Sequence, residues 1–239
     1  MASEDDPLAL RRAAAACILE GLEEAGLDRI PHPVAASSPN PVLGSEQTAA
    51  SASAPLEERI AACRACGLCE SRTQTVPGEG AAKARILFLG EAPGAQEDQS
   101  GRPFVGPAGQ LLEKILEGGM GLSRQEVYIA NVLKCRPPGN RDPLPAEILA
   151  CTPFLEEQIA TIQPELIIAL GRHAAHHLLK TDQSLSRLRG SLHHRPEGGP
   201  PVLVTYHPAY LLRNPAEKRS CWEDIQLGMR HLGMTKPGS

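Results

Sequence analysis

Four short apolar runs recur between residues 85 and 206, and segments with helical patterns separate them. The runs cover residues 85–89, 127–132, 166–170 and 201–206. Continuous apolar runs of this length are typical of strands that are buried on both faces of a parallel sheet. The helical patterns fall at residues 107–118, 153–162, 172–180 and 216–232. Strands separated by helices predict an α/β fold, with a parallel sheet and helices on both of its faces.

Local signals mark the ends of two of these helices. Pro107 stands at a first-turn position, where a missing N–H is harmless, and Gly118 with Gly119 closes the same helix. Thr152 is the expected N-cap of the helix at 153–162, and Pro153 is expected in its first position.

The first 55 residues differ in composition from the rest of the chain. Residues 8–25 predict a helix with one apolar face. Residues 31–55 are rich in Pro, Ser and Ala, and they contain too little large apolar surface to offset the entropy of ordering. We therefore expect a helix and a flexible linker at 1–55, followed by one domain at 56–235.

The net charge of −4 gives no general sign of nucleic-acid binding. The acidic excess lies in residues 1–54, so the remainder of the chain is close to neutral. Any affinity for DNA must then come from a local basic patch and from backbone amides at helix N-termini. The sequence contains no apolar run long enough for a membrane span and no secretory pattern, so we expect a soluble, cytoplasmic protein.

Chemically active side chains lie where three of the predicted strands end. The first strand runs into Glu91, the second carries Asn131 near its end, and the fourth runs into His207. Open parallel sheets bind ligands in the crevice at the carboxyl ends of their strands. A carboxylate, an amide and an imidazole on one rim predict a binding or catalytic site there.

Seven cysteines without a secretion signal favour metal or cluster ligation over a disulfide framework. Cys63 and Cys66 form a Cys-x-x-Cys pair, which places two thiolates on one turn, and Cys135 and Cys151 follow far along the chain. Four such ligands suit either structural zinc or a [4Fe–4S] cluster. One tight and one wide pair favours the cluster, because a zinc ribbon usually has two tight pairs.

The remaining cysteines have simpler interpretations. Cys69 forms a second Cys-x-x-Cys with Cys66, and the alternative is an ordinary small apolar residue one turn further on. Cys17 and Cys221 are expected to pack in helices. A set of reduced thiols without any ligand remains the alternative for the whole group.

Three stretches of the chain together resemble the family 4 uracil-DNA glycosylases, the iron–sulfur branch of that superfamily. The first stretch runs from Gly90-Glu91-Ala92-Pro93-Gly94 to Gly109. The second is residues 128–141, which read Tyr-Ile-Ala-Asn-Val-Leu-Lys-Cys-Arg-Pro-Pro-Gly-Asn-Arg, and the third is residues 207–215, His-Pro-Ala-Tyr-Leu-Leu-Arg-Asn-Pro. The similarity covers about residues 60 to 228 and keeps the motif order.

The resemblance implies a three-layer αβα fold with a central, mostly parallel four-stranded sheet. It also implies a structural [4Fe–4S] cluster with ligands Cys63, Cys66, Cys135 and Cys151, and with Cys69 outside the ligand set. The implied activity is hydrolysis of the N-glycosidic bond of uracil in single- or double-stranded DNA, with the base flipped into a pocket and an abasic site left behind. We expect a monomer that acts in base excision repair in a bacterial or archaeal cytoplasm.

Cleavage of this bond leaves positive charge on the sugar and negative charge on the base, so the site needs an anion, hydrogen-bond donors and a dry pocket. By resemblance, His207 donates a hydrogen bond to uracil O2. Glu91 positions or activates water and stabilises the cationic sugar. The alternatives are a loop histidine that bonds a backbone carbonyl, and a carboxylate that binds the amides of its own loop.

Four further groups complete the expected pocket. The amide of Asn131 matches the N3–H and O4 edge of uracil, which cytosine reverses; otherwise it satisfies the end of the sheet. Phe104 is expected to stack on the flipped base, and a core phenylalanine is the alternative. Asn140 is assigned by resemblance to catalysis near the scissile nucleotide or its phosphate. Ala92 and Glu97 are assigned to the substrate pocket.

Leu211, Leu212 and Arg213 resemble the family's insertion loop, in which an apolar wedge and a cation fill the gap left by the flipped base. The alternative is a helix start that packs its leucines inward. Phosphate contacts are expected from the basic residues around the motifs: Arg102, Lys134, Arg136, Arg141 and Arg213.

Two other functions stay open. One is a glycosylase that accepts further damaged bases, and the other is a non-catalytic, cluster-bearing DNA-binding or polymerase-associated module. The presence of Glu91, Asn131 and His207 argues against the module. Strand cleavage is not expected, because no lysine or N-terminal proline is placed to form a Schiff base. Covalent trapping of the product is disfavoured, since residues 139–143 contain no histidine.

Overall fold

The computed structural model describes residues 54–235 of the 239-residue chain. The predicted helix at 8–25 and all but the end of the linker at 31–55 lie outside the described residues. Within the described range, no helix is long and apolar enough to cross a membrane.

Six strands form one sheet in the order β1-β3-β2-β4-β6-β5, and its four inner strands are parallel. These inner strands are β3 (Tyr128–Asn131), β2 (Ile86–Gly90), β4 (Leu166–Leu170) and β6 (Val202–Thr205). They confirm the four predicted strands to within one residue at each end. Every residue of these four strands is buried except Tyr128, the first residue of β3, as the continuous apolar runs indicated.

The expectation of a four-stranded sheet was wrong at the edges. β1 (Glu79–Gly80) and β5 (Leu192–His193) pair antiparallel with β3 and β6, so the sheet is mixed and has six strands. Each added strand has only two residues, too few to carry an alternating or continuous apolar pattern.

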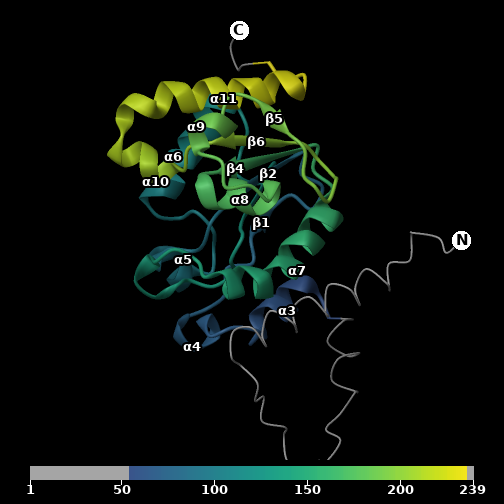
Figure 1. The fold of residues 1–239 in the computed structure, drawn as a ribbon, viewed down its shortest axis with the longest axis vertical. Helices are drawn as coiled ribbons and strands as arrows, with labels where there is room; N and C mark the ends of the chain where they lie inside the picture. Colours follow the sequence, from purple (N-terminus) through teal and green to yellow (C-terminus); the bar gives the residue numbers. More distant parts are fainter. Residues whose placement is uncertain (1–53, 236–239) are drawn as a thin grey trace, which may run out of the picture. The chain divides into compact units, whose positions relative to one another are not determined.

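Helices cover both faces of the sheet and complete three layers (Figure 1). One face carries α6 (Pro107–Lys114), the π-helix η1 (Ile115–Met120), α10 (Pro208–Arg213) and α11 (Lys218–His231). The other face carries α7 (Pro145–Ile162), α8 (Arg172–Leu179) and α9 (Leu185–Leu188). The shorter elements are α3 (Leu56–Ala61), α4 (Leu68–Ser71), α5 (Ala95–Ser100), η2 (Pro138–Asn140) and η3 (Pro215–Glu217).

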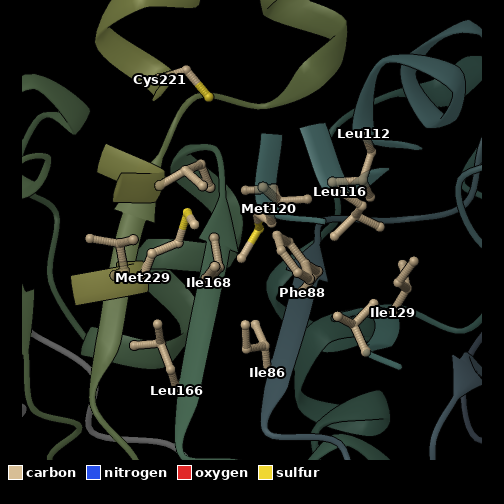
Figure 2. Close-up of a cluster of buried hydrophobic side chains, with 14 of the residues drawn as sticks. Ile86, Phe88, Leu112, Leu116, Met120, Ile129, Leu166, Ile168, Cys221 and Met229 are labelled. Atoms are coloured by element: carbon tan, nitrogen blue, oxygen red, sulfur yellow. The ribbon is translucent and has the colours of Figure 1, made fainter. Parts of the chain in front are cut away.

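Alternate residues of each strand supply two separate cores. Ile86 and Phe88 of β2 pack under α6, η1 and α11, as Figure 2 shows, together with Ile168 of β4. Leu87 and Leu89 point to the opposite face, toward α7 and α8. Burial of each such side chain stabilises the fold by about 2 kcal/mol, so both layers are held to a sheet that has no exposed face.

Helix α7 begins eight residues earlier than the sequence predicted. Pro145 takes the first helical position, and the carboxylate of Glu147 accepts a hydrogen bond from the Leu144 amide at 2.8 Å. Thr152 is therefore no N-cap; its hydroxyl donates to the Ile148 carbonyl at 2.7 Å, and Pro153 lies inside the helix. The longer helix places Cys151 on a rigid element.

One buried imidazole makes the fold sensitive to acid. His177 on α8 is 8% exposed, and its Nε2 has no hydrogen-bond partner among the described residues. Burial, with a smaller contribution from Lys180, lowers the pKa of His177 to about 4. The unfolded chain takes up a proton at a pH near 6.5, which the folded chain resists, so stability falls as the pH drops from about 6.5 toward 4.

We expect His177→Leu to remove about 2 kcal/mol of the stability that the protein loses between pH 7 and pH 5. The measurement is the free energy of urea unfolding at both pH values. The control is His231→Leu, because the His231 side chain is exposed. An equal loss in the native protein and in His177→Leu would contradict this explanation.

Candidate active site

The register of the sheet brings the ends of the parallel strands to one edge. Gly90 of β2 pairs with Asn131 of β3, and Leu170 of β4 pairs with Thr205 of β6. The chain order reverses around β2, which lies between β3 and β4, and such switch points are where open α/β sheets bind ligands.

The three side chains predicted at this rim line one cavity. Glu91 directly follows β2, Asn131 ends β3, and His207 stands two residues after β6. All three border a cavity of about 450 Å³. The cavity is also lined by Phe104, Ala92, Glu97, Asn140, Arg141 and Arg213, so nine of the candidate residues border one site.

Asn131, which borders this cavity, has an unused acceptor. The residue is 2% exposed, and its Oδ1 has no hydrogen-bond partner within residues 54–235. A buried acceptor without a partner costs about 1–3 kcal/mol, so the arrangement favours a ligand that donates a hydrogen bond. Only glycine fits beside it: a Cβ atom at Gly90 would lie 2.3 Å from Asn131 Oδ1 and 2.6 Å from the Phe104 ring.

Phe104 is held in a strained conformation at the cavity wall. Its φ of 52° lies in the left-handed region, which a bulky side chain rarely adopts, and the residue is 5% exposed. Its ring centroid is 5.6 Å from that of His207, with the two planes tilted by 32°. Phe104 also packs in the core under α6, so the core alternative holds for this residue, which borders the cavity as well.

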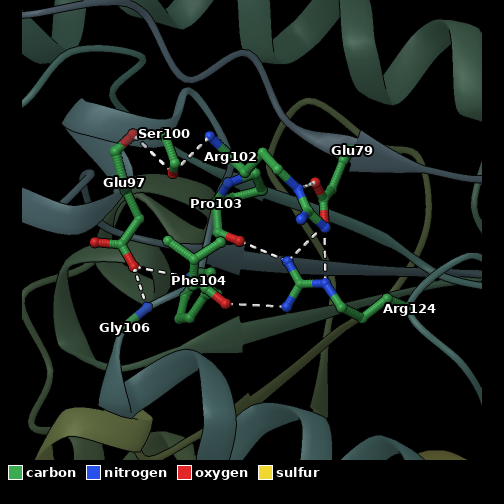
Figure 3. Close-up of polar contacts among 9 residues, drawn as sticks. Glu79, Glu97, Ser100, Arg102, Pro103, Phe104, Gly106 and Arg124 are labelled. Carbon is green, nitrogen blue, oxygen red and sulfur yellow. Dashed lines mark hydrogen bonds and ion pairs between the residues drawn. The ribbon is translucent and has the colours of Figure 1, made fainter.

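Two side chains fix the loop that carries Phe104 (Figure 3). Glu97 accepts hydrogen bonds from the Val105 and Gly106 amides at 2.9 and 3.0 Å. From the other side, Arg124 donates to the carbonyls of Phe104 and of its neighbour Pro103, at 3.0 and 2.6 Å. Glu97 was predicted as a substrate residue, and in the structure its carboxylate bonds the loop backbone.

His207 is a neutral hydrogen-bond donor at neutral pH. Its Nδ1 accepts a hydrogen bond from the Ala209 amide at 3.1 Å, at the start of α10, so the neutral ring carries its proton on Nε2. Burial lowers the pKa of His207 to about 4, and the positive charge of Arg213 acts in the same direction. A neutral imidazole N–H can stabilise a developing anion without first taking up a proton.

Glu91 is poised to exchange a proton near neutral pH. Burial, with a smaller contribution from the negative charge of Asp142, raises the pKa of its carboxyl to about 7, and Arg172 opposes the shift. A carboxyl that titrates near neutral pH is suited to act as a base toward water.

The predicted insertion residues separate into two kinds. Leu211 is 1% exposed and packs in the core, so the structure assigns it to the packing alternative. Leu212 is 44% exposed, and Arg213 borders the cavity beside it. Of the two leucines, Leu212 is therefore the one that can reach a ligand outside the protein. Asn140 is exposed at the rim, where its Oδ1 accepts a hydrogen bond from Arg136 Nε at 2.7 Å.

The four predicted ligand cysteines border a second cavity. Cys135 and Cys151 are buried, and Cys63 and Cys66 are partly buried. Cys69, which was expected outside the ligand set, lines the same cavity. Arg72 donates to Cys135 Sγ at 3.1 Å and to the Cys63 carbonyl at 2.9 Å, so one guanidinium joins two distant segments of this wall.

The other cysteines and the buried lysine do not form surface sites. Cys221 on α11 is 2% exposed, as expected of a packing residue, and Cys17 lies outside the described residues. Lys134 was expected to contact phosphate, but it is 1% exposed and donates to the Asn131 carbonyl and to Gln158. That expectation was wrong for Lys134, because its ammonium is already enclosed.

Sequence reasoning missed four groups that border or support the site. Arg172 and His173 follow β4, the one inner strand whose end was not considered, and Asp142 lies opposite them. The same rule that selected Glu91 and His207 would have selected Arg172 and His173. Arg124 gave no signal, because its partners are backbone carbonyls that only the fold brings near.

Comparisons with known proteins agree with this geometry. The sequence model of the Uracil DNA glycosylase superfamily matches residues 77–226. A type-4 uracil-DNA glycosylase of Saccharolobus solfataricus is 45% identical over 177 residues, which cover 72% of this chain and 82% of that protein. Type-4 enzymes of Sulfurisphaera tokodaii and Thermotoga maritima are 43% and 46% identical, over 75% and 72% of this chain and 84% and 90% of their own lengths.

The three-layer fold, with an acid, an amide and an imidazole around a cavity at the strand ends, defines an α/β protein of the uracil-DNA glycosylase class. Within that superfamily, the chain belongs to the type-4 uracil-DNA glycosylases.

The free energy of unfolding of the protein tests whether Arg124 supports the loop that carries Phe104. We expect Arg124→Met to lower the free energy of unfolding by about 3 kcal/mol, because it strands two buried carbonyls and removes a partner of Glu79. Arg102→Met is the matched control: Arg102 pairs with the same carboxylate, but its side chain is 58% exposed, so the cost should stay below about 1 kcal/mol. Urea unfolding measures both, and equal costs would contradict the assignment.

Proposed function

We propose that this chain hydrolyses the N-glycosidic bond of uracil in DNA and leaves an abasic site, as a monofunctional base excision repair glycosylase. The observation that carries the proposal is the free Oδ1 acceptor of Asn131, a residue that borders one cavity together with Phe104, Glu91 and His207. The membership of the chain in the type-4 family supports it.

The base selectivity would come from Asn131. Uracil carries a donor at N3 and an acceptor at O4, so it can donate to Asn131 Oδ1 and accept from the amide nitrogen. Cytosine has an acceptor at N3 and a donor at N4, and would leave the buried amide mispaired. Phe104 offers a flat apolar wall on which the flipped base can lie.

The chemistry would divide between Glu91 and His207. As the bond to the base breaks, negative charge develops on the pyrimidine, and the Nε2–H of His207 stabilises it by donating to O2. The ionised carboxylate of Glu91 stabilises the positive sugar and accepts a proton from the water that attacks C1′. Asn140, at the rim, would contact the nucleotide or its phosphate.

Extrusion of the nucleotide would use the end of α10. Leu212 is an exposed apolar side chain, and Arg213 is the adjacent cation, so together they can fill the vacated stack and bind a phosphate. Arg102, Arg136 and Arg141 are further candidates for phosphate contacts near the motif loops.

We propose further that Cys63, Cys66, Cys135 and Cys151 hold a [4Fe–4S] cluster. The donor set fits it: a single zinc ion with Zn–S bonds of about 2.3 Å would draw the sulfurs to within about 4 Å of one another. Within residues 54–235, no three cysteine sulfurs lie within 4.8 Å of one another, although all four cysteines border one cavity. Such a cluster would brace the loops around the active site, and Arg72 would offset the charge of the thiolates.

The activity itself is tested with an oligonucleotide that contains one uracil. Incubation followed by hot alkali should cut the strand at the uracil and should leave a matched cytosine strand intact. Cleavage should require the alkali, since no lyase step is expected. A protein that binds the strand without releasing uracil would instead support the non-catalytic binding module.

Glu91→Gln should lower the single-turnover rate by about a thousandfold, because the amide can neither accept the proton nor stabilise the sugar cation. Its affinity for the uracil strand, measured by fluorescence anisotropy, should change less than about threefold, because the amide has nearly the same shape. Equal losses of rate and affinity would contradict the catalytic role of Glu91.

Metal analysis tests the cluster. The purified protein should be brown, absorb in the blue and carry about four iron atoms per chain. Cys135→Ser should lose most of this iron and absorbance, whereas Cys221→Ser, which alters an equally buried thiol of the core, should keep both. A colourless protein with one zinc per chain would overturn the cluster assignment.

A further inference from the structure

A histidine and a second carboxylate adjoin Glu91 on the side of α8. His173 Nε2 lies 3.7 Å from Glu91 Oε2 and 3.3 Å from Asp142 Oδ2. One carboxylate oxygen of Glu91, one of Asp142 and one ring nitrogen of His173 all lie within 4.8 Å of one another. The proposed mechanism gives Asp142 and His173 no part, yet both adjoin its base.

His173 has two hydrogen-bonding states in this position. Arg172 Nη2 lies 3.1 Å from His173 Nε2, and a guanidinium can only donate, so this contact uses the lone pair of a neutral imidazole. When Nε2 takes up a proton it becomes a donor, and the nearest acceptors are the carboxylates of Asp142 and Glu91. The neutral imidazole therefore accepts from Arg172, whereas the imidazolium would donate to one of the two carboxylates.

Asp142 acts on Glu91 through its charge. Asp142 has no contact with the core, and its side chain is 71% exposed, so its effect is screened by water. At a separation below 4.8 Å, two unit charges in water still interact by more than half a pKa unit. A permanent negative charge at this distance opposes ionisation of Glu91.

We propose that Asp142 is a positioning residue for Glu91: its negative charge strengthens Glu91 as a base by charge repulsion. The inference rests on the proposed glycosylase function.

The directions of the pKa shifts agree with this geometry. The raised pKa of Glu91 includes a contribution from Asp142. The pKa of His173 is lowered by burial, while Asp142 opposes that change. The same region holds further charged and titratable groups on α8, on the loop before α7, and across the cavity: Arg172, His176, Arg141, Glu97, His207 and Arg213. All of them remain in the variants below, so differences between variants isolate the two residues.

The test is the pH dependence of the single-turnover rate of uracil release, with the carboxyl carbon of Glu91 followed in parallel by NMR. For Asp142→Asn, both midpoints should move to lower pH by about half a unit or more, and the rate at high pH should fall because Glu91 becomes a weaker base. For His173→Gln, both midpoints should move much less, because the imidazole that accepts from Arg172 is neutral and adds no charge beside Glu91.

Matched controls alter the same kinds of group far from the cavity. Asp182→Asn lies beyond the other end of α8, and His194→Gln follows β5 at the opposite end of the sheet, so neither should move the midpoints. A shift to lower pH for Asp142→Asn that clearly exceeds any shift for His173→Gln supports the proposal. A lower rate with unmoved midpoints for Asp142→Asn, or an equal shift for His173→Gln, overturns it. If the native protein releases no uracil, the proposed function fails, whereas the NMR midpoints still decide the electrostatic relation.

Discussion

The site depends on the parallel pairing of β2 with both β3 and β4. This register sets Gly90 beside Asn131 and delivers Glu91, Asn131 and His207 from segments far apart in sequence to one edge. Two apolar layers hold the register, since a slip of one residue would exchange the residues of the two cores. The packing of the two cores therefore fixes the positions of these three site residues.

Unfavourable local features concentrate at this edge. Phe104 adopts a left-handed backbone conformation, Asn131 buries an unpaired acceptor, and Glu91 and His207 are desolvated. Each costs about 1–3 kcal/mol, and the loop contacts of Glu97 and Arg124 hold Phe104 in place. A ligand that donates to Asn131 and accepts from His207 would relieve part of this cost, which is a physical reason for selective binding.

The sequence predicted the four inner strands and the rim residues because buried parallel strands have unbroken apolar runs and their ends share one edge. It did not predict the two-residue edge strands, α5 or α10, since such short elements carry no period. The start of α7 was misplaced because Thr152 and Pro153 imitate a helix N-terminus. Arg124 and the burial of Lys134 depend on tertiary contacts alone. His173 was within reach, had the end of β4 been considered.

The central claim is that one everted uracil occupies the cavity between Asn131, Phe104 and His207. The most direct measurement is a crystal structure of Glu91→Gln bound to a DNA strand that contains deoxyuridine. We expect the base in the cavity, with N3 about 3 Å from Asn131 Oδ1 and O2 facing His207 Nε2. A uracil that remains stacked in the DNA, or that enters the cavity and leaves Asn131 Oδ1 unpaired, would contradict the account.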